Sequence, residues 1–397
     1  MSTLLSHKKT GTRDIPKEWG LVRLGEVISL KYGKGLSEKK RTTGPFPVVG
    51  SNGIIGYHNQ SLIQGPGIVV GRKGSIGSVS WVDLDFWPID TTYYVAVLRQ
   101  DVDLRWLYFS LLKLNLQRLG QADVVPGLRR ELVHILMFPF PPLTEQKKIA
   151  DILWTVDETI QKVGQAIEKT QKLKEGLMQQ LLTKGIGHRE FNKTDSGMIP
   201  KTWELKRLKE ISVDFVSGGT PSTSKDEYWN GDIPWMTSAF ITEREVKTGQ
   251  RFITSEGLKK SATKIVPKNN LLVATRVGIG KAAVNRIDIA ISQDLTGVII
   301  DNNKAIPDFL YWHIVNDEKR LKSMAQGSTI KGILREDLQK ISLPLPPLPE
   351  QQKIAEILSS VDKRIETLRK RKERLEKVKK GLMEDLLTGK KRVKLED

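Results

Sequence analysis

The sequence predicts an α+β protein in which two similar domains are separated by two long helices. We expect these helices to pack antiparallel as a coiled coil, giving the chain a pseudo-twofold internal repeat. Residues 141–183 align without a gap to residues 346–388, and 22 of the 43 paired positions are identical. Upstream of each, residues 15–26 (IPKEWGLVRLGE) match residues 199–210 (IPKTWELKRLKE). Repetition on this scale indicates a tandem duplication, so each half should form the same kind of unit.

Each copy of the longer repeat is expected to form one helix. Both copies open with two prolines and a Glu-Gln pair, which favour a helix start. Apolar residues then recur every seven positions, which predicts a coiled-coil seam. Thr170, Lys174, Lys372 and Lys379 interrupt the later part of the seam and should weaken it. Because a whole block of chain lies between two similar stripes, mutual antiparallel pairing is favoured over packing of each helix on its own domain. The predicted seam consists of Ile149, Leu153, Val156, Ile160, Val163 and Ile167 in the first helix, and Ile354, Leu358, Val361, Ile365, Leu368 and Leu375 in the second.

The blocks between the helices alternate β-forming residues with Gly, Asn and Ser turns, and helical patches follow. Strands are predicted within Phe46–His58, Gly67–Val82, Asp90–Leu98, Asn270–Val284 and Ala290–Ile300, and helices within Leu104–Leu119 and Pro307–Met324. The predicted domains are residues 1–142 (first α+β domain), 143–185 (first helix), 186–345 (second α+β domain), 346–389 (second helix) and 390–397 (basic tail).

The charge balance indicates a polyanionic partner. Sixty-four Lys and Arg against 46 Asp and Glu give a net charge of +18, which favours nucleic acid ahead of an acidic membrane. The absence of cysteine excludes disulfide scaffolds, zinc fingers and iron–sulfur clusters. Five dispersed histidines offer no transition-metal site, so no metal is expected. No apolar run is long enough for a membrane span and the N-terminus lacks a secretory signal, so we expect a cytoplasmic protein.

Catalytic motifs are not recognisable in the chain. The Phe140-Pro141-Pro142-Leu143 segment lacks the polar first residue and the final aromatic residue of an adenine methyltransferase motif. The glycines of Gly278-Ile279-Gly280 are not followed by a third glycine or a distal acid, so a dinucleotide loop is not predicted. Lys281 is not followed by Ser or Thr, which excludes a Walker A motif. We therefore expect no catalytic residue.

Polar and basic turns in the two blocks carry side chains of the kinds that contact DNA, so we expect DNA contacts there. Arginine reads guanine, Asn and Gln read adenine, and lysines and backbone amides hold phosphates. In the motif alignment Arg72 corresponds to Arg276 and Gly74 to Gly278. The predicted DNA contacts in the first block are Ser51, Asn52, Tyr57, His58, Asn59, Arg72, Lys73, Ser75, Arg129 and Arg130; those in the second are Thr220, Arg276, Lys281, Ser328, Lys331 and Arg335.

These motifs resemble the specificity subunits of type I restriction–modification systems, from about Ile15 to Thr388. The matching phrases are IPKxWxLxRLxE, PPLxEQ…IAxIL…GLMxxLLT, PVVGSNGIIGYHN, GRKGSIGSV, WPIDTTYYV, SGGTPS and QGSTIKGI. The resemblance implies two target-recognition domains, each reading one half of a split double-stranded DNA site, and two helices that set the gap. The two blocks differ in sequence, so the site should be asymmetric.

The resemblance also implies the partners. Two modification subunits carrying S-adenosylmethionine would dock on this chain to form an adenine methyltransferase, and restriction subunits would add ATP-driven translocation and cleavage. This chain itself would bind no cofactor, because S-adenosylmethionine, ATP and Mg²⁺ belong to the partner subunits. It would act without contact to a membrane, on the nucleoid of a prokaryotic cytoplasm.

Two alternatives remain open from the residues. The first is a self-contained DNA nuclease or methyltransferase with duplicated domains, which would act on DNA without partners. The second is a scaffold that bridges two identical proteins through its repeated helices and does not bind DNA specifically.

Overall fold

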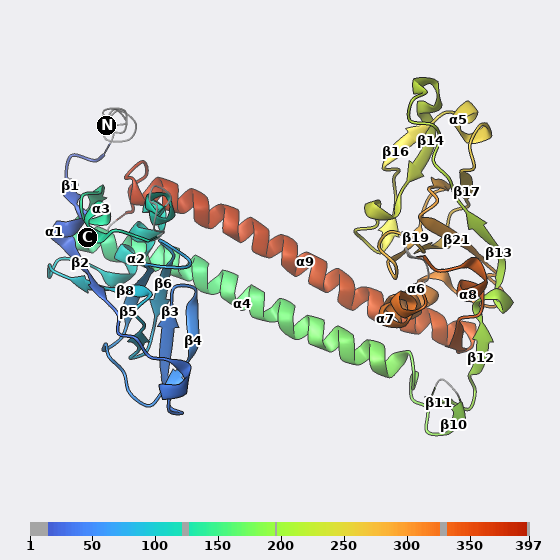
Figure 1. The fold of residues 1–397 in the computed structure, drawn as a ribbon, viewed down its shortest axis with the longest axis horizontal. Helices are drawn as coiled ribbons and strands as arrows, with labels where there is room; N and C mark the ends of the chain where they lie inside the picture. The colour runs from blue at the N-terminus through green and yellow to red at the C-terminus, as the bar shows by residue number, and fades with distance from the viewer. Residues whose placement is uncertain (1–14, 121–126, 195–196, 326–331, 395–397) are drawn as a thin grey trace. The chain divides into compact units, whose positions relative to one another are not determined.

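The computed structural model describes residues 15–120, 127–194, 197–325 and 332–394. The chain divides into two compact units (Figure 1). Unit 1 comprises residues 1–165 and 369–397, and unit 2 comprises residues 166–368. Each unit therefore contains one of the two predicted blocks together with part of both long helices.

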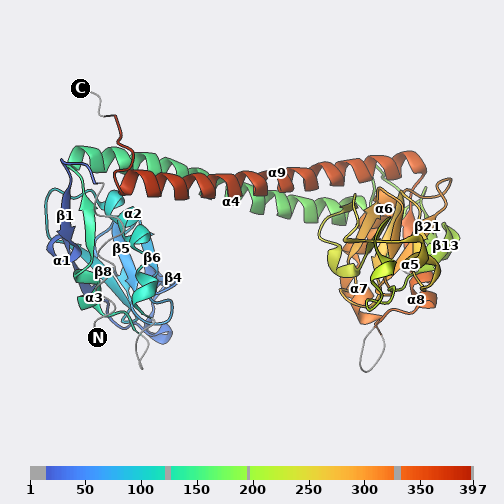
Figure 2. The same ribbon diagram turned by 90° about the horizontal axis from the view of Figure 1, so that it is seen from above.

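The two repeats form the two long helices α4 (Leu143–Leu181) and α9 (Leu348–Leu387). In unit 1, the first part of α4 packs antiparallel to the last part of α9; in unit 2, the last part of α4 packs on the first part of α9 (Figure 2). None of the twelve residues of the predicted seam is exposed. The seven that are fully buried are Ile149, Leu153, Val163, Ile354, Leu358, Ile365 and Leu368.

Two of the three seam lysines are paired across the helices, whereas Lys372 lies 4.0 Å from Glu376 of its own helix. Lys379 forms an ion pair with Asp157 in unit 1, and Lys174 forms one with Asp362 in unit 2. The amine of Lys379 also lies 5.4 Å from the ring centre of Phe109, and that of Lys174 lies 4.9 Å from the ring centre of Trp312. A polar residue at a seam position fixes helix register and orientation at some cost in stability. These lysines therefore specify the antiparallel register.

Unit 1 contains two sheets, with strand orders β2-β8-β5-β6 and β4-β3-β7. The pairing is antiparallel except between β3 and β7. The predicted strand and helix segments of this block are confirmed. The strands are β2 (Ile28–Tyr32), β3 (Phe46–Gly50), β4 (Gly53–His58), β5 (Gly67–Gly71), β6 (Val79–Val82), β7 (Trp87–Pro88) and β8 (Thr92–Val97); the helices are α1 (Leu24–Val27), α2 (Leu104–Leu114) and α3 (Arg130–His134).

Unit 2 repeats these sheets and extends them, with strand orders β13-β21-β18-β19-β15 and β16-β14-β20-β17. In chain order, β13, β14, β16, β18, β19, β20 and β21 correspond to β2, β3, β4, β5, β6, β7 and β8. The strands are β13 (Ser212–Ser217), β14 (Trp229–Met236), β15 (Glu245–Val246), β16 (Arg251–Ile253), β17 (Lys264–Val266), β18 (Asn270–Ala274), β19 (Ala282–Asn285), β20 (Ile289–Ile291) and β21 (Leu295–Ile300); the helices are α5 (Ser255–Lys259), α6 (Pro307–Asn316), α7 (Glu318–Ser323) and α8 (Arg335–Gln339).

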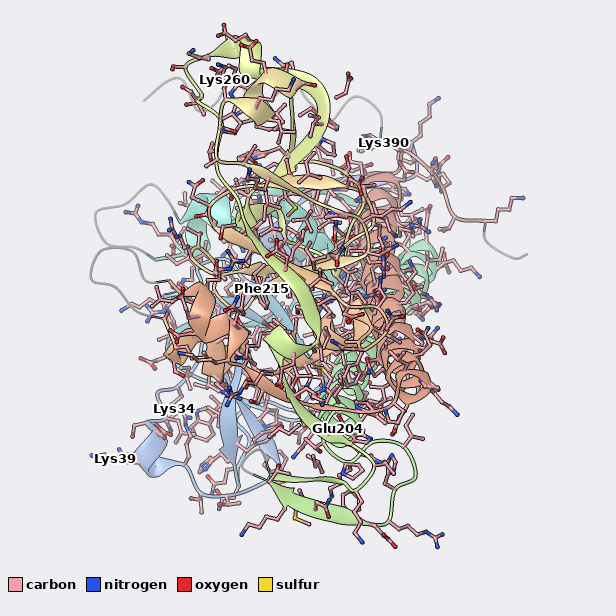
Figure 3. All side chains as sticks on the ribbon, turned by 90° about the vertical axis from the view of Figure 1, so that its right-hand side faces the viewer. Lys34, Lys39, Glu204, Phe215, Lys260 and Lys390 are labelled. Atoms are coloured by element: carbon pink, nitrogen blue, oxygen red, sulfur yellow. The ribbon has the colours of Figure 1, made fainter. Side chains whose placement is uncertain are left out.

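The extra length of the second block lies in two places. The turn Ser51-Asn52 between β3 and β4 is replaced by residues 237–250, which contain β15. The short connection before β5 is replaced by residues 254–269, which contain α5 and β17, and Figure 3 shows Lys260 projecting from this added segment. Unit 2 also carries a separate ribbon of β10 (Phe191–Thr194) and β11 (Gly197–Pro200).

The two sequence repeats meet in the structure, because the Trp of one motif contacts the Glu of the other. A two-stranded ribbon carries each Trp motif: β1 (Gly20–Arg23) pairs with β9 (Met137–Phe140), and β12 (Glu204–Arg207) pairs with β22 (Ser342–Leu345). The indole of Trp19 donates to Glu145 at 2.9 Å, and that of Trp203 donates to Glu350 at 3.0 Å. This contact fixes each block on the start of one long helix.

The Gln of each PPLxEQ motif ties the helix start to the segment before α2 or α6. Gln146 accepts from the amide of Asp103 and donates to the carbonyls of Asp101 and Pro141, at 2.9–3.0 Å. Gln351 makes the same three bonds in unit 2, including one from the amide of Ile306 at 2.9 Å. Both side chains are fully buried. The repeat therefore reflects a buried hydrogen-bond network.

Candidate nucleic-acid interface

The loop between β5 and β6 in unit 1 lies among several of the predicted DNA contacts. The amides of Arg72 and Lys73 both donate to the carbonyl of Thr91, at 2.9 and 3.0 Å. The amide of Ser75 donates to the hydroxyl of Ser51 at 3.4 Å, which joins this loop to the β3–β4 turn. The carbonyl of Arg72 accepts from the amide of Leu128, which draws the segment ahead of α3 to the same place. The structure thus gathers Ser51, Arg72, Lys73, Ser75, Arg129 and Arg130.

Arg72 is held in a fixed orientation at the centre of this group. Its Nε and Nη2 donate to the carbonyl of Asp90 at 3.1 and 2.8 Å. Its guanidinium lies 5.2 Å from the ring centre of Tyr32, and that of Arg130 lies 5.4 Å from the same ring. Tyr32 is 52% exposed at the end of β2. Two cations on an exposed aromatic ring form a rigid, positively charged surface that suits a nucleic acid.

Tyr93 supports this surface from below. Its ring centre is 5.1 Å from that of Tyr32, and its hydroxyl donates to the carbonyl of Leu128 at 2.9 Å. Burial, together with Tyr32, raises the pKa of Tyr93 to about 12, so the phenol stays protonated and keeps donating. The arrangement is therefore insensitive to pH near neutrality.

The remaining predicted contacts of unit 1 divide into exposed and buried residues. Lys73, Asn52 and Asn59 are exposed, and Tyr57 is 53% exposed. The prediction that His58 contacts DNA must be corrected, because its side chain is only 7% exposed. Its Nδ1 accepts from the amide of Thr42 at 3.0 Å, and its ring packs edge-on against Trp87. Alternation along β4 turns His58 inward when Tyr57 faces solvent, so His58 is a structural residue.

The equivalent loop of unit 2 joins β18 to β19 and begins in the same register. The amide of Gly71 donates to the carbonyl of Ser78, and the amide of Ala274 donates to that of Lys281. Loops 71–78 and 274–281 therefore have equal length. Counting from these ends places Arg72 opposite Thr275 and Lys73 opposite Arg276.

The predicted equivalences of Arg72 with Arg276 and of Gly74 with Gly278 are therefore wrong by one residue. The motif alignment matched Arg72-Lys73-Gly74 to Arg276-Val277-Gly278 without a gap, which is one residue out of step with the strand pairing on both sides of the loop. Gly74 and Gly278 both adopt positive φ, at 73° and 72°, one position apart in this register. The loops consequently differ in their internal conformation.

Two exposed cations of unit 2 lie on this loop. Arg276 and Lys281 are exposed, and neither side chain forms a hydrogen bond or ion pair within the part of the chain that the structure describes. Thr220 donates to the side chain of Gln293 at 2.6 Å, and Arg335 pairs with Asp214 at 3.1 Å. Ser328 and Lys331 lie outside the described residues.

Sequence reasoning missed Tyr32, Asp90 and Gln293. Asp90 and Gln293 occupy the same turn in the two units, between β7 and β8 or between β20 and β21. One sequence signal could have identified Tyr32 as a candidate contact residue. It stands at the end of a strand in the segment Lys31-Tyr32-Gly33, where an aromatic residue precedes a glycine. The long-range contacts that make these residues part of the group have no local sequence signature.

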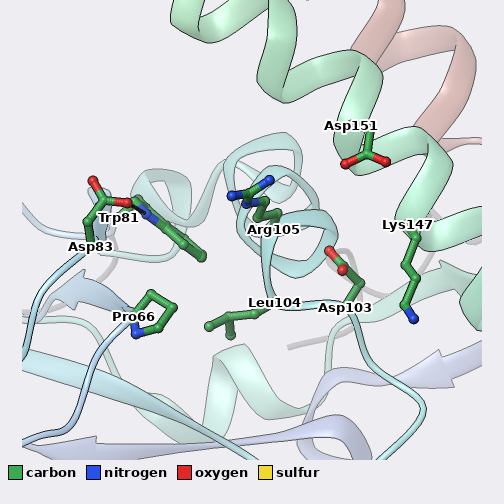
Figure 4. A pocket seen from close by; sticks show the side chains of 8 residues that line it. All are labelled: Pro66, Trp81, Asp83, Asp103, Leu104, Arg105, Lys147 and Asp151. Atoms are coloured by element: carbon green, nitrogen blue, oxygen red, sulfur yellow. Dashed lines mark hydrogen bonds between the residues drawn. The ribbon is translucent and has the colours of Figure 1, made fainter.

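The described residues contain no group of three or more acidic, His or Cys side chains that could hold a metal ion. None of the described helices combines the length and the apolar character that a membrane span requires. A cavity of about 430 Å³ in unit 1 is lined by Pro66, Trp81, Asp83, Asp103, Leu104, Arg105, Lys147 and Asp151 (Figure 4). It lies beside β6 and the start of α2, and none of the predicted DNA contacts lines it.

The model of the family described as the type I restriction modification DNA specificity domain matches residues 16–172 and 200–377. These two matches span most of the chain, so the chain belongs to this family. It is a DNA-specificity protein with two recognition domains, and this membership agrees with the predicted non-catalytic role.

Two relatives come from Methanocaldococcus jannaschii. The putative type I restriction enzyme MjaX specificity subunit is 33% identical over 261 residues, which are 65% of this chain and 60% of that protein. The type I restriction enzyme MjaVIII specificity subunit is 29% identical over 420 residues, covering 96% of this chain and 94% of that protein. The solved S subunit of a type I restriction-modification system from M. genitalium has a TM-score of 0.69 at 17% identity, over 94% of this chain and 97% of that one. The last match supports the fold.

Proposed function

We propose that each unit reads one half of a split, asymmetric DNA site, and that α4 and α9 set the unspecified gap between the halves. The observation that carries the proposal is the repeated fold with unlike loops. Both units have the same central strand order, yet loop 71–78 carries Arg72 and Lys73 where loop 274–281 carries Thr275 and Arg276. Equivalent scaffolds with different reading side chains suit two different half-sites.

The proposed contacts divide by their geometry into two kinds. Arg72 is fixed by Asp90 and Tyr32, and a pre-organised guanidinium suits bidentate contact with a guanine edge. Lys73 and Arg276 occupy equivalent exposed positions without a partner among the described residues. Such free cations suit phosphate contacts, which position the protein without reading sequence.

The helices supply a stiff spacer of sufficient length. A helix of 39 residues, as in α4, is about 58 Å long. Half-sites one turn of DNA apart are about 34–36 Å apart, so helices of this length can span the gap. The Lys–Asp pairs support the role, because a spacer keeps its length only if its register is fixed.

The partners follow from the same symmetry. Two equivalent helix ends, each fixed by a Trp–Glu contact, would dock two identical modification subunits. Those subunits would hold S-adenosylmethionine and receive the flipped adenine, and restriction subunits would use ATP and Mg²⁺. This chain would contribute recognition and no cofactor.

The test is the genome-wide pattern of adenine methylation, read by long-read sequencing with and without this gene in its source strain. Loss of one split, asymmetric motif on deletion is the expected result, and it would give both half-sites and the gap. If the methylation pattern were unchanged while the modification subunit is expressed and co-purifies with this chain, the proposal would be wrong.

A further inference from the structure

The first sheet of unit 1 ends in a strand edge that is covered in unit 2. In unit 2, β15 pairs in parallel with β19. The amide of Val284 donates to the carbonyl of Arg244, and the amide of Arg286 donates to that of Val246, both at 2.8 Å. In unit 1 the equivalent strand β6 is the last strand of its sheet within the described residues.

The open edge of β6 has the same register as the covered edge of β19. Ile68 pairs with Trp81 as Leu271 pairs with Val284. The amide of Trp81 therefore points away from β5, towards the position that β15 takes in unit 2. An unpaired edge of this kind is a template for an added strand.

Charged side chains hold β15 in place in unit 2. Asp308, in the first turn of α6, pairs with Arg244 and accepts from Arg286 at 2.7 Å. Arg286 also pairs with Glu245 at 2.8 Å. Burial raises the pKa of Glu245, but hydrogen bonds from Lys247 and Arg286 and the charge of Arg244 outweigh it and lower this pKa to about 2. The basic Arg244, which precedes β15, and the acidic Glu245, which begins it, thus match the charges of the site that holds the strand.

In unit 1, the positions equivalent to Asp308 and Arg286 carry charges opposite to those in unit 2. Arg105 stands in the first turn of α2 where Asp308 stands in α6, because Asp103 and Ile306 make the same bond to Gln146 and Gln351. By the strand register, Asp83 stands where unit 2 has Arg286. A strand suited to this edge must therefore be acidic where β15 has Arg244 and basic where it has Glu245.

The cavity of Figure 4 lies at this place and contains both side chains. The guanidinium of Arg105 lies 4.5 Å from the ring centre of Trp154, and its donors make no hydrogen bond to the described residues. The amine of Lys147 likewise has no hydrogen-bond or ion-pair partner among the described residues. Asp83, Asp103 and Asp151 line the same cavity, and three carboxylates disfavour a polyanion such as DNA.

We propose that the β6 edge of unit 1 binds one extended segment of a partner protein as a parallel strand. The segment carries an acidic residue against Arg105, then a basic residue against Asp83, then an apolar residue where Val246 lies in unit 2. Because β15 fills the equivalent edge in unit 2, each chain binds one such segment, in unit 1. The site gives a partner a means to distinguish the two otherwise similar units.

The test uses the full chain and two labelled peptides that cover residues 241–249. One peptide has the native sequence, and the other carries Arg244→Glu together with Glu245→Arg. We expect the charge-swapped peptide to bind one site per chain at least about tenfold more tightly, which corresponds to about 1.4 kcal/mol. Fluorescence anisotropy gives the affinity, and hydrogen exchange at Trp81 and Asp83 gives the place.

A charge-reversed chain supplies the decisive comparison. The double variant Arg105→Asp with Asp83→Arg should reverse the preference and favour the native peptide, whereas Lys39→Glu, an exposed control in unit 1, should leave it unchanged. Equal affinity for both peptides, an unchanged preference in the double variant, or no binding up to about 1 mM peptide would overturn the proposal. If the chain associated with itself and Arg105→Asp abolished this association, the proposal of a partner protein would be overturned, and the β6 edge would bind a second copy of the chain.

Discussion

Units 1 and 2 have the same scaffold and differ in an exposed loop, at one sheet edge and at one position of an equivalent helix. The central strand orders agree, the Trp–Glu and Gln contacts at the helix starts agree, and burial raises the pKa of the equivalent Tyr108 and Tyr311 to about 12. The differences lie in the loops after β5 and β18, at the edges of β6 and β19, and inside α2 and α6. The buried contacts are repeated, whereas the exposed loops and edges vary, which is expected if the two units hold the same partners and read different DNA.

The largest expected effect breaks a contact that both units share. Gln146→Leu removes three hydrogen bonds and leaves the amide of Asp103 and the carbonyls of Asp101 and Pro141 without partners. We expect a loss of about 3–5 kcal/mol of stability in unit 1. Hydrogen exchange measured by mass spectrometry should show this loss in unit 1, and Gln351→Leu should give the matching loss in unit 2. A loss confined to one of the two variants would contradict the equivalence of the helix starts.

A second prediction is that the stability of unit 2 falls more on acidification than the stability of unit 1. The Nε2 of His313 in α6 is buried without a hydrogen-bond partner among the described residues, and burial lowers the pKa of the imidazole to about 4, whereas Ser110 occupies the same position in α2. The unfolded chain protonates this histidine near its ordinary pKa of 6.5. The stabilisation is therefore complete above about pH 6.5 and is lost as the pH falls towards 4, by about 3 kcal/mol.

Hydrogen exchange at pH 7 and pH 5 checks this difference. Unit 2 should lose more protection than unit 1 on acidification. His313→Ser copies unit 1 and should remove the pH dependence of unit 2, even though the variant is less stable at both pH values. Equal acid sensitivity in the wild type and the variant would rule out His313 as the cause.

A third, smaller effect concerns the paired lysines of the helices. Lys379→Met leaves Asp157 partly buried without its partner and should cost about 2 kcal/mol in unit 1. The double variant Lys379→Met with Asp157→Leu should recover most of that loss, because both charges are removed. Denaturant unfolding of the two variants and the wild type gives these differences. Lys174→Met with Asp362→Leu is the matched test in unit 2.

The smallest effect concerns the positively charged loop residues. Lys73→Ala and Arg276→Ala should each weaken binding to all DNA sequences similarly and lower the salt dependence of binding by about one counterion. Arg72→Ala should instead cost about 1–3 kcal/mol against the preferred base and relax specificity at that position. Binding of the complete methyltransferase complex to cognate and mutated sites, measured at several salt concentrations, separates the two kinds of residue.

The sequence predicted the features that local patterns carry. Heptad spacing gave the seam from Ile149 to Leu375, and turn residues gave the hairpin of β3 and β4. The loops with Arg72 and Arg276 also lie where their glycines indicated. Each of these features depends on residues within a few positions of one another.

The features that sequence did not predict depend on long-range contacts. The role of Lys379 requires Asp157 on another helix, and the burial of His58 requires Trp87 on a different strand. The register that places Arg276 opposite Lys73 follows from backbone hydrogen bonds at both ends of the loop. Residue spacing in the sequence does not determine this register. Nor did the sequence predict β15, because a two-residue strand has too little pattern to distinguish it from a loop.

The central claim is that each unit reads its own half-site, and one measurement tests it most directly. Arg72→Ala and Arg276→Ala are introduced separately into the source strain, and the methylation motif of each strain is read by long-read sequencing. We expect Arg72→Ala to change the base preference in one half of the motif only, whereas Arg276→Ala lowers the methylation of the whole motif without changing base preference, and the gap is unchanged in both strains. A change of base preference in both halves on Arg72→Ala, or a change in the gap, would contradict the account.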